Sequence, residues 1–174
     1  MKRFAAVTMI LLAVLVLGAS PALAQTTTPK PPPTYEQVIV NTWKNVHNKI
    51  LNMAKDTVYP DAKLSYKPHP DSRTVIDELR HVTIGLEMTT AIAKGEKYDF
   101  GAAEKALAAK PQTRAAVVAE MEAAIAASYA VLDALGAKPM PQLIGWIEHQ
   151  GEHYGKLVNA YRVNGIVPPV SRPK

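Results

Sequence analysis

Two histidines four residues apart are the side chains of this sequence best suited to bind a metal ion. They are His149 and His153, in the segment WIEHQGEHYGKLVNAYR of a 174-residue chain that holds five histidines. A helix turns about 100° per residue, so the two imidazoles would lie one turn apart on one face. Trp146, Leu157 and Ala160 share that face, which predicts that it points inward. Two neutral imidazoles in this arrangement can chelate a divalent ion, or they can form ordinary hydrogen bonds at the edge of a core.

The segment HQGEH also matches the H-x-x-E-H signature of inverted zinc proteases, with Glu152 as the general base. Such a site needs a third, acidic ligand further along the chain. No Asp or Glu follows Glu152, and only 21 residues follow His153. The sequence therefore disfavours a protease, and we expect Glu152 to be a solvated side chain.

A third candidate ligand is His81, on the predicted inner face of a helical segment at 73–93. A single histidine in such a place is more often a packed core residue. Combined with His149 and His153, it would complete a site of three imidazoles from two helices. The fourth position would then be open to water or substrate, as in catalytic zinc sites.

The two remaining histidines are weaker candidates. His47 falls near the apolar stripe of the first predicted helix. It could be a further metal ligand, a hydrogen-bond partner of a ligand or a packed side chain, and packing is the favoured interpretation. His69 lies between two prolines in a connection, and we assign it no role.

The composition excludes several classes of site. The chain has no cysteine, which excludes disulfides, thiolate metal ligands and a cysteine nucleophile. Its 20 Lys and Arg and 15 Asp and Glu give a formal net charge of only +5. Nucleic-acid binding normally requires basic residues clustered on one face, so we expect no nucleic-acid partner.

The N-terminal residues are typical of a secretory signal peptide. Two basic residues precede an apolar run at 5–17, and Ala22 and Ala24 place small side chains at the −3 and −1 positions of a cleavage site. This run is shorter than the roughly 20 residues that span a bilayer. We expect residues 1–24 to be removed, which lowers the net charge to +3. The mature protein would be periplasmic or secreted, with no stable membrane anchor.

The rest of the sequence predicts an all-α domain. A polar, Pro/Thr-rich leader at 25–33 precedes a domain at 34–170. Amphipathic periodicity predicts four helices, at about 34–57, 73–93, 111–135 and 141–163. Thr34 and Gln37 form a capping-box pattern for the first, Asp71 or Ser72 could cap the second, and Pro111 suits the first turn of the third.

The connections favour a four-helix bundle with parallel middle helices. The last two helices are joined by a short link, so they must be antiparallel. The connection at 95–110 could reach roughly 50 Å when extended, against about 30 Å for a 20-residue helix. It is therefore long enough to cross the bundle, and one or two helical turns are expected around 103–108.

Two stretches resemble the DinB-like superfamily of bacterial four-helix bundles. They are TWKNVHNKILNMAKDTVYPDAKLSYKPHPDSRTVIDELRHV and WIEHQGEHYGKLVNAYRVNGIVPP, and the similarity covers roughly residues 34–170. The resemblance implies that His81, His149 and His153 together bind a divalent metal ion. It also implies parallel middle helices and a homodimer. Relatives include transferases and isomerases that use low-molecular-weight thiols, an analogy that the predicted export weakens because those thiols are chiefly cytoplasmic.

Two functions follow as expectations. In the first, the three histidines hold zinc or nickel in a hydrolase or transferase of a small-molecule substrate, and Glu78, one turn before His81, takes a proton from bound water. In the second, the bundle binds a metal ion or small ligand without turnover. A fourth position closed by His47 would favour the second function, and an open position facing a pocket would favour the first. A bundle that no longer binds metal is the third alternative.

Overall fold

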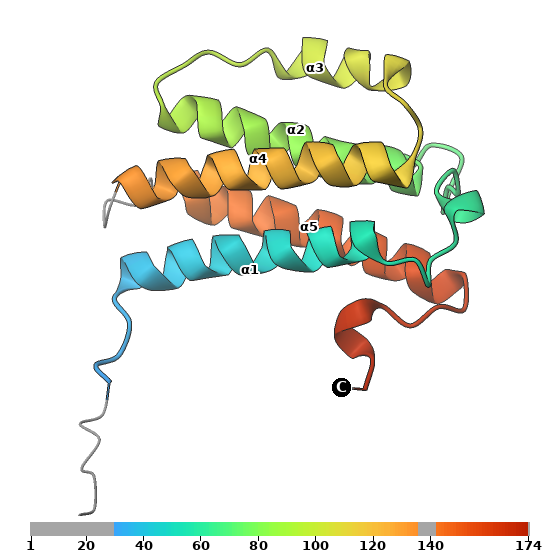
Figure 1. The fold of residues 1–174 in the computed structure, drawn as a ribbon, viewed down its shortest axis with the longest axis horizontal. Coiled ribbons are helices and arrows are strands. Elements are labelled where there is room, and N and C mark those ends of the chain that lie inside the picture. The colour runs from blue at the N-terminus through green and yellow to red at the C-terminus, as the bar shows by residue number, and fades with distance from the viewer. Residues whose placement is uncertain (1–29, 136–141, 174) are drawn as a thin grey trace, which may run out of the picture. The chain divides into compact units, whose positions relative to one another are not determined.

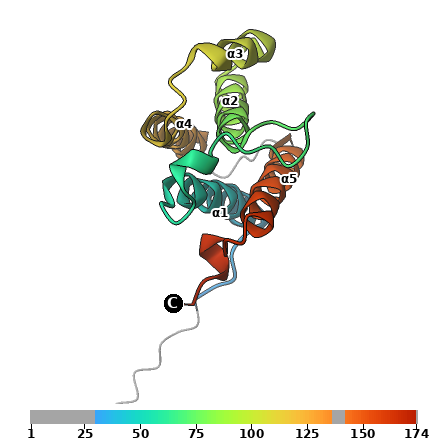
Figure 2. The same ribbon diagram turned by 90° about the vertical axis from the view of Figure 1, so that its right-hand side faces the viewer.

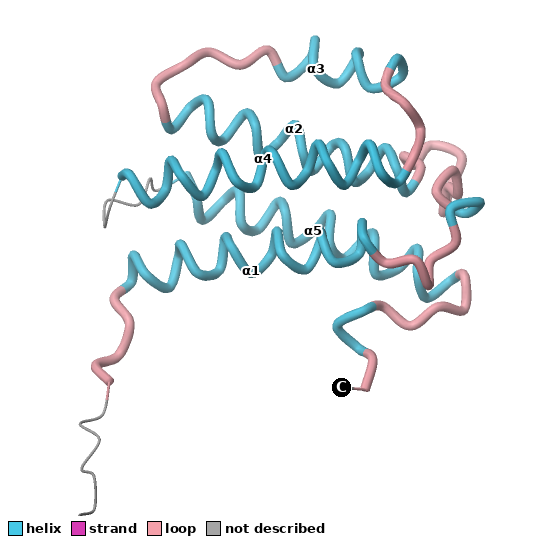
Figure 3. The backbone as a smooth tube through the Cα atoms, in the orientation of Figure 1, coloured by secondary structure: helices cyan, strands magenta, loops and turns pink. Residues whose placement is uncertain are grey.

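The computed structural model describes residues 30–135 and 142–173. Within these residues it contains five α-helices and no strand, so the predicted all-α class is confirmed (Figure 3). The helices are α1 Tyr35–Lys55, α2 Val75–Ala93, α3 Phe100–Ala106, α4 Arg114–Leu135 and α5 Gln142–Val163. The predicted signal peptide at 1–24 and the start of the leader lie outside the described residues.

The four long helices lie side by side. α2 packs against α4 and α5, and α1 packs against the same two helices. The colour sequence in Figure 1 shows that α2 and α4 run in one direction and that α1 and α5 run in the other. The crossover between α2 and α4 carries the short helix α3, which lies on the outer side of α2 when the helices are viewed along their axes (Figure 2).

The core is built from one apolar face of each long helix. On α1, buried residues recur at three- and four-residue steps: Trp43, Val46, Ile50, Met53 and Ala54. On α4, the buried positions include Met121, Ile125, Ser128 and Leu132. The indole N–H of Trp43 donates a hydrogen bond to Ser128 Oγ over 3.0 Å, which satisfies the polar groups of both buried side chains.

Helix α2 is the most enclosed helix, with 14 of its 19 residues buried. Arg80 on this helix is fully buried, and its guanidinium contacts Glu120 of α4 at 3.3 Å. The same guanidinium donates to the carbonyl of Pro111 at the end of the crossover. These contacts fix the rotation of α2 relative to α4, and hence the direction in which the remaining side chains of α2 point.

Two helix starts differ from the sequence-based expectation. The cap of α2 is Thr74, whose Oγ1 accepts from the backbone N–H of Asp77 at 3.1 Å, so Asp71 and Ser72 are not its caps. The Thr74 hydroxyl also donates to the Asp77 carboxylate. The N-cap side chain is therefore paired with both the backbone N–H and the side chain of Asp77. α4 begins at Arg114, after Pro111, because Thr113 caps it: the Thr113 hydroxyl accepts from the backbone N–H of Ala116 and the Thr113 carbonyl accepts from that of Val117.

Among the described helices, only α4 is long and apolar enough to cross a membrane by length and composition. Its sequence is rich in alanine, and its buried seam packs against α1 and α2. Core helices of globular proteins commonly have this composition, and the packing of α4 identifies it as a helix of the bundle.

Candidate metal centre

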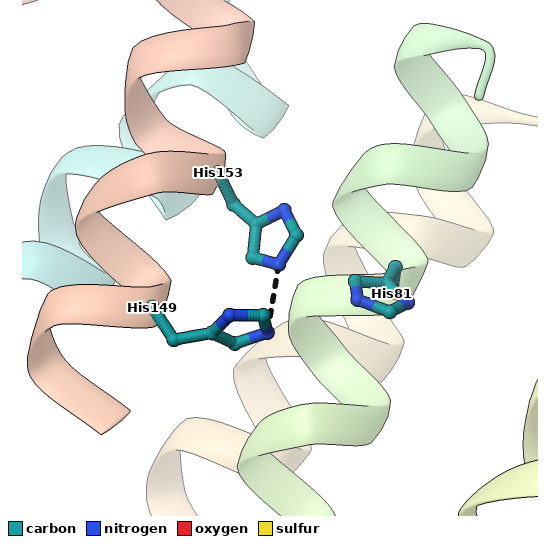
Figure 4. Close-up of side chains that lie close together, drawn as sticks. All are labelled: His81, His149 and His153. Atoms are coloured by element: carbon teal, nitrogen blue, oxygen red, sulfur yellow. Dashed lines mark hydrogen bonds between the residues drawn. The ribbon is translucent and has the colours of Figure 1, made fainter. Parts of the chain in front are cut away.

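Helices α2 and α5 bring the three predicted ligands together. His81 projects from α2 toward His149 and His153, which lie one turn apart on α5 (Figure 4). One ring nitrogen from each residue lies within 4.8 Å of the other two. The Nε2 atoms of His149 and His153 are 3.0 Å apart. The grouping predicted from spacing and from resemblance is therefore present in the structure.

The group lies at the boundary between core and solvent. His153 and His81 are buried, at 1% and 7% exposure, whereas the side chain of His149 is 51% exposed. Leu157 and Ala160 of α5 are buried. The helix face predicted to be buried is therefore buried at its C-terminal end and becomes exposed to solvent at His149. A molecule from solvent could therefore reach the three rings from the side of His149.

Glu78 determines the orientation of His153. The Nδ1–H of His153 donates to Glu78 Oε1 over 2.7 Å, and both side chains are buried. With the proton on Nδ1, the neutral form of the ring has its lone pair on Nε2, the atom that faces His149. The predicted proton acceptor Glu78 thus contacts a predicted metal ligand directly.

A second carboxylate, Glu104 on α3, has the same relation to His81. Its Oε1 accepts from His81 Nδ1 at 3.0 Å and also from Arg73 Nη2 at 2.6 Å. Phe100, one turn earlier on α3, places its ring edge-on to His81 with the centroids 5.4 Å apart. Neither of these two residues of α3 was predicted from the sequence. Their four-residue spacing in FGAAEKA was the one local signal that they share a helix face.

The surroundings favour the neutral form of His81 and His149 and the ionised form of Glu78 and Glu104. Burial lowers the pKa of His81, and the charge of Arg73 lowers it further. Burial also lowers the pKa of His149. Burial acts to raise the pKa of Glu78, but its hydrogen bond with His153 and the nearby cations outweigh this effect and lower it. The hydrogen bond from Arg73 lowers the pKa of Glu104. Neutral imidazole is the form that coordinates a metal ion.

The donor set fits a late first-row divalent ion. Two imidazole nitrogens bound tetrahedrally to zinc at 2.0–2.1 Å would lie about 3.3 Å apart, close to the observed 3.0 Å between His149 and His153. Metal-binding histidines almost always donate their other N–H to a carboxylate, a carbonyl or water, and His81 and His153 both donate to a carboxylate. The residues present therefore suit a metal ion held by three nitrogens.

The remaining predicted residues lie apart from this group. His47 is 1% exposed in the core, where its Nδ1–H donates to the Trp43 carbonyl over 2.8 Å. Its Nε2 atom has no hydrogen-bond partner among the described residues. His69 is exposed in the connection before α2. The Glu152 side chain is 55% exposed and lies 3.9 Å from His149 Nδ1, in agreement with the expected solvated position.

Comparison with known protein families gives a match over most of the bundle. The sequence model of the DinB superfamily matches residues 39–160, a region that includes His81, His149 and His153. The chain belongs to the DinB superfamily. No curated protein and no solved structure matches it. DinB proteins bind metal ions, and the three histidines of this DinB protein form a group that could do so.

Two cavities lie near the histidine group of this DinB protein or the carboxylate that contacts it. One, of about 300 Å³, is lined by His81 and His149 together with residues of α2, α3 and α5. The other, of about 590 Å³, is lined by Glu78, Arg73 and Lys156 together with other residues of α2, α5 and the connection before α2. None of the three histidines lines this larger cavity, so only the smaller cavity gives a bound molecule direct access to the imidazoles.

Proposed function

We propose that this DinB protein binds one divalent metal ion through His81, His149 and His153 and acts as a metal-dependent hydrolase or transferase. The observation that carries the proposal is the convergence of three imidazoles, two of which are oriented at Nδ1 by carboxylates. Zinc and nickel are the favoured ions because the donors are all nitrogen and no thiolate exists in the chain.

The residues of the chain would orient the site and leave one side open. A divalent ion, when bound, supplies Lewis acidity and lowers the pKa of a bound water. Glu78 and Glu104 hold His153 and His81 with their Nε2 lone pairs directed into the group. Because Glu78 Oε1 is engaged with His153, we propose a positioning role for Glu78 rather than the proton transfer suggested by its sequence position.

Two observations bear on whether the site turns over a substrate. His47 lies apart from the group, and the exposed His149 borders a cavity, which supports an open fourth position and an enzyme. In the part of the chain that the structure describes, Glu78 and Glu104 are both engaged by histidines, so neither is free to act as a base. This second observation favours the alternative, a protein that binds a metal or small ligand without catalysis.

Metal content tests the first part of the proposal. Inductively coupled plasma mass spectrometry of the purified protein, after reconstitution with zinc or nickel, should find about one ion per chain. The variants His81→Ala, His149→Ala and His153→Ala should lose the ion while keeping the helical circular dichroism spectrum. His69→Ala is the matched control and should retain it. A wild type without metal after reconstitution would contradict the proposal.

Turnover tests the second part. The metal-loaded protein should be incubated with panels of ester, amide and thiol-transfer substrates, beside the same protein stripped with a chelator. Turnover that depends on the metal and disappears in His149→Ala would support the enzyme. One tightly bound ion with no turnover across the panels would support the non-catalytic binding protein.

A further inference from the structure

Two basic side chains converge on the cavity of about 590 Å³ that Glu78 also lines. Arg73 comes from the connection before α2, and Lys156 comes from α5. Ligand sites in proteins commonly have volumes of about 300–1,000 Å³, so this cavity is large enough for a small molecule. None of the three histidines lines it, so a molecule bound there would not be a ligand of the proposed metal ion.

Both basic side chains have hydrogen-bond donors that no described residue occupies. Arg73 donates from Nη2 to Glu104 Oε1 over 2.6 Å, but its Nη1 lies 3.7 Å from Glu78 Oε2. Lys156 Nζ lies 3.8 Å from Glu78 Oε1. The last two distances are too long for hydrogen bonds. The side chains of Arg73 and Lys156 are 36% and 56% exposed, so a dissolved molecule can reach these donors.

The accessible wall of this cavity is mainly polar. Ser72 and Asn159 add a hydroxyl and an amide beside the two basic side chains. The apolar residues Val75, Leu157 and Ala160 also line the cavity, but they are almost fully buried and offer little surface to a ligand. The cavity therefore suits a small polar molecule with several hydrogen-bond acceptors.

The charges around the cavity favour an anion once a divalent ion is bound. Asp71 lines the cavity, but its side chain is 92% exposed and is screened by solvent. The carboxylates of Glu78 and Glu104 balance the charges of Arg73 and Lys156. A divalent ion held by three neutral imidazoles would add two positive charges to this balanced group, and this excess would attract an anion.

Arg73 connects the cavity with the carboxylates of the proposed metal centre. Its guanidinium contacts Glu104, which orients His81, and lies near Glu78, which orients His153. An anion on Arg73 would therefore lie close to the divalent ion without contacting it. Attraction between the two charges raises the affinity of the protein for each, and thermodynamic linkage requires the same factor in both directions.

We propose that this cavity binds a small oxyanion, presented by a carboxylate or a phosphate group, between Arg73 and Lys156. The oxyanion and the divalent ion bind with positive cooperativity. Ser72 and Asn159 supply further donors to the oxygens that face away from Arg73. The cooperativity rests on the proposed metal site, whereas the oxyanion site is tested independently of it.

The test titrates the full chain with sulfate and with acetate at constant ionic strength, with chloride as the balancing ion. Sulfate represents a phosphate group, and acetate represents a carboxylate. Heteronuclear NMR of the ¹⁵N-labelled protein should show saturable shifts of the backbone amides at 72–74 and 156–159. Sulfate should bind the zinc-loaded protein about fivefold more tightly than the chelator-treated protein, as expected for opposite charges roughly 10 Å apart in a water-like dielectric. The anion with the higher affinity identifies the group that the site prefers.

A single-charge variant assigns the anion to this cavity. Lys156→Gln should weaken sulfate binding about fivefold or more and should leave the zinc content as in the wild type. Arg162→Gln is the matched control, because Arg162 is exposed on the same helix and does not line the cavity. The location of the shifted amides in the wild type remains decisive if Lys156→Gln fails to fold.

The outcomes separate the oxyanion site from the metal site. Sulfate binding that Lys156→Gln leaves unchanged would overturn the oxyanion site, because the anion would then bind elsewhere, for instance on the metal ion. Zinc binding with no saturable shift at these amides would overturn the oxyanion site and leave the metal site standing. A protein that binds no zinc, but binds sulfate in a way that depends on Lys156, would overturn the metal site and the cooperativity alone.

Discussion

At the scale of single residues, two carboxylates determine which nitrogens of the site are free. Glu78 and Glu104 each accept from the Nδ1–H of a histidine, and they come from different helices. Without these acceptors, the imidazoles of His153 and His81 could rotate or change tautomer. The affinity for a metal ion should therefore depend on residues that do not bind it.

Glu78→Gln and Glu104→Gln should each weaken zinc binding by about 10–100-fold, because the neutral amide accepts a weaker hydrogen bond from the ring. Competition with a chromophoric zinc chelator measures this affinity. Glu148→Gln, exposed on α5, is the control and should bind zinc as the wild type does. Equal affinity in Glu78→Gln and Glu148→Gln would show that the carboxylate does not orient the site.

His47 should make the stability of the fold depend on pH. Burial lowers its pKa from 6.5 to about 4, against a weaker opposing effect of the Trp43 carbonyl. The unfolded chain therefore binds more protons between these values, and the stability present above pH 6.5 is lost as the pH falls toward 4. This single residue should remove about 2.5 kcal/mol of stability by pH 4.5.

Urea unfolding of the chelator-treated protein at pH 7.0 and 4.5 checks this expectation. His47→Gln retains a donor for the Trp43 carbonyl but has no group that titrates in this range. The wild type should lose about 2.5 kcal/mol more than His47→Gln does between the two pH values. All other titrating groups are shared, so equal losses in the two proteins would exclude His47 as the cause.

At the scale of helices, the N-terminus of α2 holds the part of the helix that carries Glu78 and His81. Thr74 caps this helix, Glu78 follows one turn later, and His81 lies three residues after Glu78. The same helix N-terminus carries Asp77, whose backbone N–H is satisfied by the Thr74 hydroxyl. A frayed first turn would therefore loosen Glu78 before any other residue of the site.

Thr74→Ala should lower the free energy of unfolding by about 1 kcal/mol, the usual effect of removing a capping hydroxyl. Ser72→Ala, at a position that the sequence offered as a cap, should have almost no effect. Thermal or urea unfolding of the two variants compares them directly. A larger loss in Ser72→Ala than in Thr74→Ala would mean that the helix begins where the sequence pattern placed it.

The helices differ in how far sequence could predict them. The seam of α1, the boundaries of α5 and the grouping of the three histidines follow from local periodicity and from resemblance. The contribution of α3 could not be predicted in this way, because Glu104 reaches His81 across 23 residues of chain. That contact depends on how the crossover folds back over α2, and the alanine-rich crossover has no periodic pattern that specifies its path.

At the scale of the whole molecule, we propose that residues 1–24 direct export and are then removed. When the full sequence is expressed in a Gram-negative host, the product recovered from the periplasm or medium should begin at Gln25. N-terminal sequencing or intact mass measures this directly. Ala24→Arg should leave an unprocessed chain, because signal peptidase requires a small residue at that position. An unprocessed wild type in the cytoplasm would contradict the proposal.

The order of the helices along the chain has a kinetic consequence. α2 and α5 supply the three histidines, and α5 is the last α-helix of the described chain, with its two histidines lying far beyond His81 in the sequence (Figure 1). A nascent or translocating chain offers these residues to solvent one group at a time, and a lone imidazole or an isolated pair competes poorly for scarce ions. The three come together only when α5 docks against α2, so high-affinity capture of the proposed metal ion would be a late event in maturation. On the exported route, the ion would then be chosen by the compartment in which folding finishes rather than by the one in which the chain is made.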